Sequence, residues 1–116
     1  MKVLDANKLT PRPVMEDGAE CATICELITA DDGAPTFAMR LFELEPGGHT
    51  MYHSHPWEHE VFILEGAGVV VGPDGGAPFA QGTAIYLEPN RPHQFRNTGA
   101  KRVRFICCIP AEQLCG

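Results

Sequence analysis

Residues 47–60 read GGHTMYHSHPWEHE, a stretch with four histidines at positions 49, 53, 55 and 59. Side chains two positions apart in a β-strand lie on the same face, so His53 and His55 are expected to point in one direction. Two imidazoles placed in this way can bind one metal ion from neighbouring coordination positions. The Pro56-Trp57 pair then bends the chain before the next apolar run, which allows a third ligand a few residues later.

A fifth histidine lies in a second polar segment, residues 89–97, which read PNRPHQFRN. His93 of this segment can join His53 and His55 at one site if a distant strand returns beside them, as happens when a sheet closes on itself. His49 fits no repeat of this geometry, and we expect it on an exposed loop or beside the ligands.

Short apolar runs separated by turn signals surround both segments. The runs are rich in β-branched and aromatic residues and are interrupted by Gly, Pro or Asp-Gly. No window keeps a 3.6-residue period over the length of a helix. The pattern therefore predicts an all-β barrel or sandwich with almost no helix. The run 36–45, TFAMRLFELE, is apolar on both faces, which indicates packing on both sides or a partner subunit.

The composition indicates a single globular domain of 116 residues. We expect this domain at 19–116, behind a Pro-punctuated extended arm at 1–18. The formal charge of −6 argues against nucleic acid as a partner, because phosphate binding needs a clustered basic face. The N-terminus has no export signal and no apolar run is long enough to span a membrane, so we expect a cytoplasmic protein without a membrane segment.

The cysteines are odd in number and have no secretory signal before them, so we expect reduced thiols. They are Cys21, Cys25, Cys107, Cys108 and Cys115.

The two histidine segments together resemble the two motifs of the cupin superfamily. The spacing Gly47-x5-His53-x-His55, followed by Gly66, resembles the first motif. The stretch from Gly82 through Pro89 to His93-x3-Asn97 resembles the second motif. The string HSHPWEHEVFILEG is similar to a small subgroup in which a histidine replaces the usual glutamate ligand. The resemblance implies a double-stranded β-helix (jelly-roll-like) barrel with the metal inside, most often in a homodimer.

The same resemblance implies a four-histidine metal site formed by His53, His55, His59 and His93. Family members place six residues between the third ligand and the glycine, and this count back from Gly66 arrives at His59. Glu60 lies at a spacing from His55 that some cupins use for their glutamate, so the two counts conflict, and we favour His59. Arg91 replaces a common glycine of the second motif, and Pro89 lies one residue closer to His93 than usual.

Imidazole ligands suit a divalent transition metal. The resemblance implies manganese first, with Fe, Ni, Cu, Co or Zn as alternatives, because the ligands alone do not select among them. Four ligands around an octahedral ion leave two positions open for water, oxygen, peroxide or a substrate, which is typical of a catalytic metal. We therefore expect an oxidoreductase that uses dioxygen or peroxide on a small organic substrate. A Lewis-acid isomerase or decarboxylase and a non-catalytic cupin that binds a small ligand are the alternatives.

The last apolar run gives two candidate pocket residues. If Arg102 and Arg104 face solvent, alternation turns Phe105 and Cys107 inward. A hairpin through residues 98–100 would place the strand that carries His93 beside this run, so both side chains are expected near the metal. Cys107 is equally well explained as a small core residue.

Overall fold

A computed structural model describes residues 1–112 of the protein. Cys115 and the end of the predicted domain lie outside the described residues. Within 1–112 the regular elements are strands and two single-turn 3-10 helices, with no α-helix. The helices are η1 (Ala6–Lys8) and η2 (Ala30–Asp32). The strands are β1 (Arg12–Pro13), β2 (Glu20–Ile28), β3 (Phe37–His49), β4 (His59–Glu65), β5 (Ala67–Gly72), β6 (Gly75–Ala80), β7 (Ala84–Leu87), β8 (Gln94–Arg96) and β9 (Val103–Pro110).

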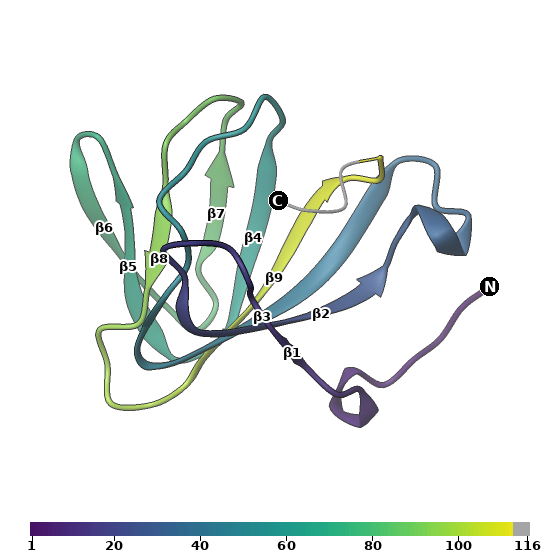
Figure 1. The fold of residues 1–116 in the computed structure, drawn as a ribbon, viewed down its shortest axis with the longest axis horizontal. Helices are drawn as coiled ribbons and strands as arrows, with labels where there is room; N and C mark the ends of the chain where they lie inside the picture. The colour runs from purple at the N-terminus through teal and green to yellow at the C-terminus, as the bar shows by residue number, and fades with distance from the viewer. Residues whose placement is uncertain (113–116) are drawn as a thin grey trace.

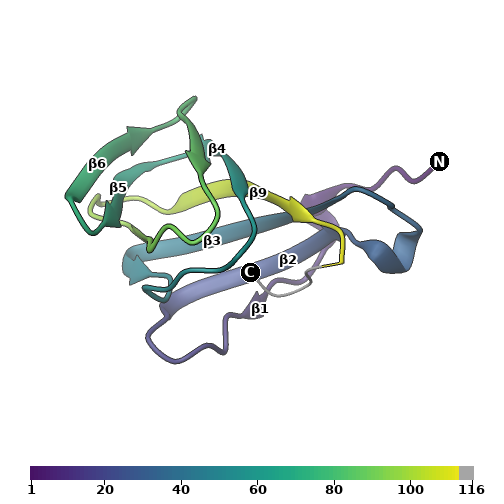
Figure 2. The ribbon, with the colours of Figure 1, turned by 90° about the horizontal axis from the view of Figure 1, so that it is seen from above.

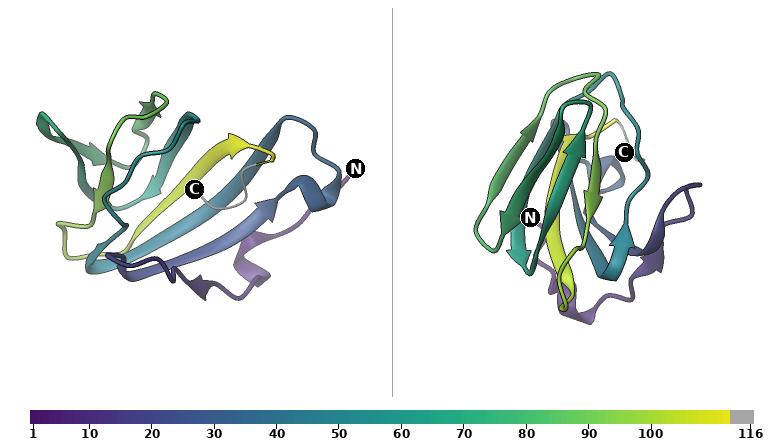
Figure 3. Two further views of the ribbon diagram at one scale, coloured as in Figure 1. Left: turned by 45° about the horizontal axis from the view of Figure 1, so that its top comes forward. Right: turned by 90° about the vertical axis from the view of Figure 1, so that its left-hand side faces the viewer.

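The strands form one strongly curled antiparallel sheet (Figure 1). Its order is β6-β5-β8-β3-β9-β4-β7, and β2 and β1 extend from the side of β3. The long strand β3 joins the two halves, because it pairs with β9 over its first part and with β2 as far as its last residue, His49, which also pairs with Arg96 of β8. The expected all-β, double-stranded β-helix class is confirmed. Among residues 1–112 the barrel stays open between its end strands β6 and β7 (Figure 3).

Alternation along the strands determines which side chains form the core. In β9 the residues Val103, Phe105, Cys107 and Ile109 are buried, as parity predicted. In β4 the buried residues are His59, Val61 and Ile63, whereas Phe62 and Leu64 face outward. The inward side chains of these strands form one hydrophobic core. The other strands contribute Leu44, Phe79, Leu87 and Phe95 to it.

The predicted hairpin between the strand after His93 and β9 is wrong. Strand β8 pairs with β3 and β5, and β9 lies between β3 and β4. Asn97, which is 3% exposed, accounts for the difference. Its amide donates hydrogen bonds to the carbonyl oxygens of Leu44 (2.9 Å) and Lys101 (2.8 Å), which stabilise a loop that leads the chain away from β8.

The turn between β4 and β5 depends on Gly66. Its φ is +88°, a left-handed conformation that glycine adopts without a steric penalty. A Cβ atom at this position would also collide with the carbonyl oxygen of Arg102. The glycine of the first motif is therefore required by backbone geometry.

The N-terminal segment packs along the outer side of β2 and β3 (Figure 2). Strand β1 pairs with β2, and Leu4 and Ala6 pack against a second cluster that contains Leu41. This segment covers part of the outer apolar face of 36–45, so packing on both sides explains much of that pattern. Phe37, at the start of β3, remains 65% exposed.

Four cysteines lie in the described range and all are free thiols: Cys21, Cys25, Cys107 and Cys108. No helix in residues 1–112 has the length and apolarity needed to cross a membrane.

Candidate metal centre

Two backbone hydrogen bonds bring the two histidine segments together. The His53 N–H donates to the carbonyl oxygen of His93 (3.1 Å), and the His93 N–H donates to that of His53 (2.9 Å). This isolated bridge lies between segments forty residues apart in sequence, and it places both side chains at the same end of the barrel. One ring nitrogen from each of His53, His55 and His93 lies within 4.8 Å of the others. These three imidazoles form a group that could hold a metal ion.

His59 stands directly beside this group. It is the first residue of β4, it is 4% exposed, and its Nε2 lies 2.9 Å from Nδ1 of His55. Its ring centroid is 5.1 Å from that of His93. Glu60 lies on the outer face of the same strand and is exposed, so its side chain points away from the histidines. Burial and a hydrogen bond with Glu58 raise the pKa of Glu60.

Two contacts fix the orientation of the rings. The Nδ1–H of His93 donates to the carbonyl oxygen of Arg91 at 2.7 Å, which leaves Nε2 with a free lone pair. The ring of His55 stacks on Trp57, with centroids 4.6 Å apart and an interplanar angle of 7°. Arg91 departs from the family motif, yet it orients His93 through its backbone.

The histidines are held in their neutral form. Burial lowers the pKa of His53 to about 4 and that of His59 to about 2, and the neighbouring histidines and Arg40 add to both shifts. Burial also lowers the pKa of His93, against the effect of its hydrogen bond to Arg91. Neutral imidazole is the form that binds a metal. The donor set and its protonation state therefore fit a divalent transition metal.

This electrostatic arrangement predicts how stability of the metal-free protein changes with pH. The histidine pKa values are lower in the folded state than the value of about 6.5 expected after unfolding, so unfolding takes up protons at acidic pH. Stability is therefore expected to be full above about pH 6.5 and to fall as the pH drops toward 4. Urea titrations at several pH values measure this, and a free energy of unfolding that stays constant between pH 7 and 5 would contradict it.

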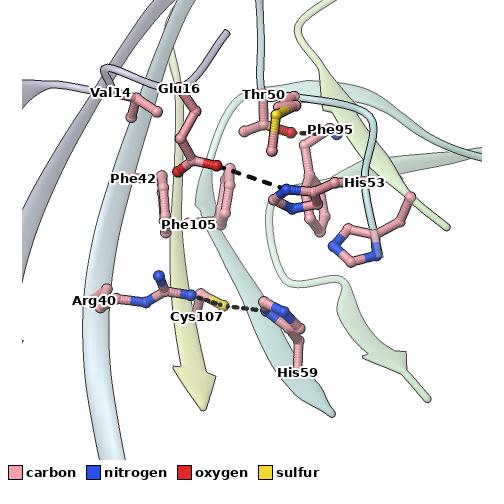
Figure 4. A pocket seen from close by; sticks show the side chains of 12 residues that line it. Val14, Glu16, Arg40, Phe42, Thr50, His53, His59, Phe95, Phe105 and Cys107 are labelled. Carbon is pink, nitrogen blue, oxygen red and sulfur yellow. Dashed lines mark hydrogen bonds and ion pairs between the residues drawn. The ribbon is translucent and has the colours of Figure 1, made fainter. Parts of the chain in front are cut away.

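An apolar pocket opens beside His53, His59 and His93 (Figure 4). Its empty space, with the open solvent at its mouth included, measures about 400 Å³. Phe42, Phe95 and Phe105 form one wall, with Phe105 stacked on Phe42 at 5.2 Å and on Phe95 at 4.7 Å between centroids. The predicted pocket residues Phe105 and Cys107 both line this space.

Arg40, Cys107 and His59 lie in a row along one side of the pocket (Figure 4). Cys107 Sγ is 3.0 Å from Nδ1 of His59 and accepts a hydrogen bond from Nη2 of Arg40 at 3.3 Å. Burial raises the pKa of Cys107, against the effect of Arg40, so it is a neutral thiol at pH 7.

Sequence reasoning did not identify two charged pocket residues. Arg40 is 2% exposed and points inward from β3, although a charged residue in a strand is normally assigned to the solvent face. Glu16 comes from the N-terminal segment and reaches the pocket mouth, where its carboxylate lies 3.6 Å from Nδ1 of His53. Burial raises the pKa of Glu16, with an opposing effect from Arg40. The alternation of Arg40 with Ala38 and Phe42 is the signal that could have revealed its inward position.

His49 lies at the end of β3 and does not belong to the group of three histidines. Its Nδ1 lies 3.1 Å from the carbonyl oxygen of Thr50 and 3.3 Å from the side-chain nitrogen of Gln94.

The chain is similar to several known proteins. Its structure matches that of the polyketide cyclase RemF from Streptomyces resistomycificus with a TM-score of 0.90 and 34% identity, over 96% of this chain and 80% of that one. It also matches a predicted oxalate decarboxylase from Thermotoga maritima with a TM-score of 0.85, over 95% of this chain and 99% of that one, but at 22% identity that likeness concerns the fold alone. Among sequences, the 1-methylthio-D-xylulose 5-phosphate methylsulfurylase of Rhodospirillum rubrum is 26% identical over 98 residues.

An uncharacterized protein of Methanocaldococcus jannaschii is 32% identical over 63 residues, which are 53% of this chain. The matched regions span 50% of that relative and 63% of the methylsulfurylase. The family of the Cupin domain matches residues 40–109, which include all four site histidines and strands β4 to β8. Because this match covers more than half of the chain, the protein belongs to the cupin family.

Proposed function

We propose that this cupin is a metal-dependent enzyme that closes a ring in a substrate with several carbonyl groups. The observation that carries the proposal is the convergence of neutral imidazoles on an apolar, phenylalanine-lined pocket. The likeness to a polyketide cyclase over 96% of this chain supports the same reaction class.

We further propose that His59 completes the ligand set with His53, His55 and His93. His59 is buried and adjacent to His55, whereas the side chain of Glu60 faces outward. The resemblance on which the site was predicted favours manganese, and the metal content of the purified protein decides between it and Fe, Ni, Cu, Co or Zn.

A bound divalent ion would supply Lewis acidity that polarises a carbonyl oxygen and makes the adjacent C–H acidic. The protein's own residues would do the rest. The phenylalanine wall would bind the apolar part of the substrate and exclude water, and the histidines would hold the metal beside the pocket. In the ring closure, the C–H bond of the activated carbon would break and this carbon would form a C–C bond to a second carbonyl carbon. The proton released from the activated carbon would end on the new alkoxide oxygen. The reaction needs no oxidant.

The test is to restore the native metal and to incubate the protein with a linear synthetic tetraketide thioester while oxygen is monitored. The expected result is a cyclic product, found by mass spectrometry, with no oxygen consumed. The oxygen- or peroxide-using reaction expected from the sequence remains the second candidate. Oxygen uptake in proportion to product would support that reaction against a cyclase.

Separate replacement of His59 and of Glu60, the first two residues of β4, distinguishes a ligand set with His59 from one with Glu60. Loss of a group that supports a metal ligand typically lowers metal affinity by about 10–100-fold. His59→Ala is expected to lower metal affinity by this amount or more. Glu60→Gln is expected to leave metal content almost unchanged, because its side chain is exposed on the opposite face. Elemental analysis after dialysis measures both. If Glu60→Gln empties the site while His59→Ala keeps it full, a site of three histidines and one carboxylate replaces the four-histidine assignment.

The homodimer expected from the sequence stays a prediction. Phe62 and Tyr86 project from the outer faces of the paired strands β4 and β7 and are 48% and 60% exposed, a surface that a second copy could cover. Light scattering at micromolar concentration is expected to give the dimer mass, and a monomer mass would contradict the prediction.

A further inference from the structure

We propose that Arg40 binds the carboxylate of the substrate, so that this pocket takes β-oxo carboxylates. The inference deepens the proposed function, because it names the substrate class of the same pocket. It rests, however, on the surroundings of Arg40 and not on the metal.

Arg40 is a buried cation whose hydrogen bonds are incomplete. It is 2% exposed, and its guanidinium lies 5.1 Å from the ring centroid of Phe42. Its Nη2 donates only to the weak acceptor Cys107 Sγ, and its Nε is buried with no hydrogen-bond partner among residues 1–112. No ion pair within this range includes Arg40. Almost all buried charges in proteins are paired, so an unpaired one that lines a pocket indicates a missing anion.

Arg40 and Glu16 give the pocket one charge of each sign. Glu16 is the one acid that lines the pocket in the described part of the chain, and its carboxylate lies next to His53. A divalent ion in the histidine group would add further positive charge. With such an ion bound, the pocket would carry excess positive charge, which a ligand with a negative group would balance better than a neutral one.

The chemistry of the guanidinium favours a carboxylate. Its planar N–H groups match the two oxygens of a carboxylate, and Arg40, whose buried Nε–H has no partner among residues 1–112, lines the pocket. The thiol of Cys107 connects the guanidinium to His59, with its Sγ 3.3 Å from Nη2 of Arg40 and 3.0 Å from Nδ1 of His59. A β-oxo carboxylate has its carbonyl close to its carboxylate, so it can contact Arg40 and the histidine group together. The phenylalanine wall accepts an apolar extension beyond the carbonyl.

The experiment compares acetoacetate with its neutral analogue acetoacetamide, which have the same size and differ in charge. Each is titrated by NMR into the protein with and without its metal. Wild type is expected to bind acetoacetate at least ten times more tightly than acetoacetamide in both forms. In the wild-type spectrum the Nε–H signal of Arg40 is expected to move downfield with acetoacetate and to stay in place with acetoacetamide.

Arg40→Met and Arg40→Gln are expected to reduce the preference for acetoacetate to less than threefold. Arg96→Met is the control, because it removes the same charge from an exposed position on β8 and is expected to keep the preference. The proposal is overturned if the Arg40 variants keep the wild-type preference, or if acetoacetate leaves the Arg40 Nε–H signal unmoved. The shift of the Arg40 Nε–H signal in the wild-type protein decides the question even if both Arg40 variants misfold.

The metal-free arm separates this proposal from the proposed function. If acetoacetate binds through Arg40 but the loaded protein makes no cyclic product, the anion site stands and the cyclase assignment fails. If ring closure proceeds equally well with acids and amides, and the Arg40 variants behave as wild type, the cyclase stands and the anion site fails.

Discussion

His93→Ala is expected to remove the bound metal almost completely and to abolish any activity that depends on it. His93 is 4% exposed, its ring is oriented by the carbonyl oxygen of Arg91, and its backbone is bridged to that of His53. Loss of a residue that merely supports a metal ligand costs 10–100-fold in affinity, so loss of this ligand is expected to cost more than about 100-fold. A competition titration against a chelator of known affinity measures the change.

His49→Ala is the matched control for this variant. It removes an imidazole from the same region, but His49 is not part of the histidine group and contacts Thr50 instead. Its metal affinity is expected to stay within a factor of about three of wild type, by the usual scale of changes at sites away from the ligands. Equal losses in the two variants would contradict the assignment of His93.

Ile63→Ala is expected to destabilise the fold by about 2–5 kcal/mol, the range for deletion of a fully buried branched side chain. Ile63 is 0% exposed and belongs to the main core, where it lies across from Phe105 in the β4–β9 ladder. The cost combines lost apolar burial with the cavity left in a barrel that cannot collapse around it. Urea unfolding of the metal-free protein measures the change in free energy.

Phe62→Ala provides the comparison from the opposite face of the same strand. Phe62 is 48% exposed, so its removal is expected to change the free energy of unfolding by no more than about 0.5 kcal/mol. The measurement is made at low protein concentration so that self-association does not contribute to the free energy of unfolding. A larger loss for Phe62 than for Ile63 would mean that the inner and outer faces of β4 are assigned the wrong way round.

Strand parity made much of this protein predictable from its sequence. Alternation in 103–109 placed Phe105 and Cys107 on the inner face, where the structure has them. The spacing of His53, His55 and His93 predicted that distant segments meet, and the backbone bridge between His53 and His93 shows how they do. Periodicity and turn residues indicated the all-β class because both are local properties of the chain.

The features that sequence reasoning missed depend on long-range contacts. The hairpin after His93 failed because the amide of Asn97 bonds to Leu44, far away in sequence, and leads the chain to another part of the sheet. Arg40 was overlooked because a buried unpaired cation contradicts the rule that charges face solvent. Glu16 was treated as part of an extended arm, whereas its segment follows the barrel and reaches the pocket.

X-ray absorption spectroscopy of the metal-loaded protein tests the central claim most directly. We expect about one divalent transition metal ion per chain after purification without chelator, surrounded by imidazole nitrogens at about 2.0–2.2 Å. The multiple scattering is expected to fit four imidazoles in wild type and three in His59→Ala. A spectrum without imidazole scattering, or a protein that retains no metal above the level of the His93→Ala variant, would contradict the claim that these histidines form a metal centre.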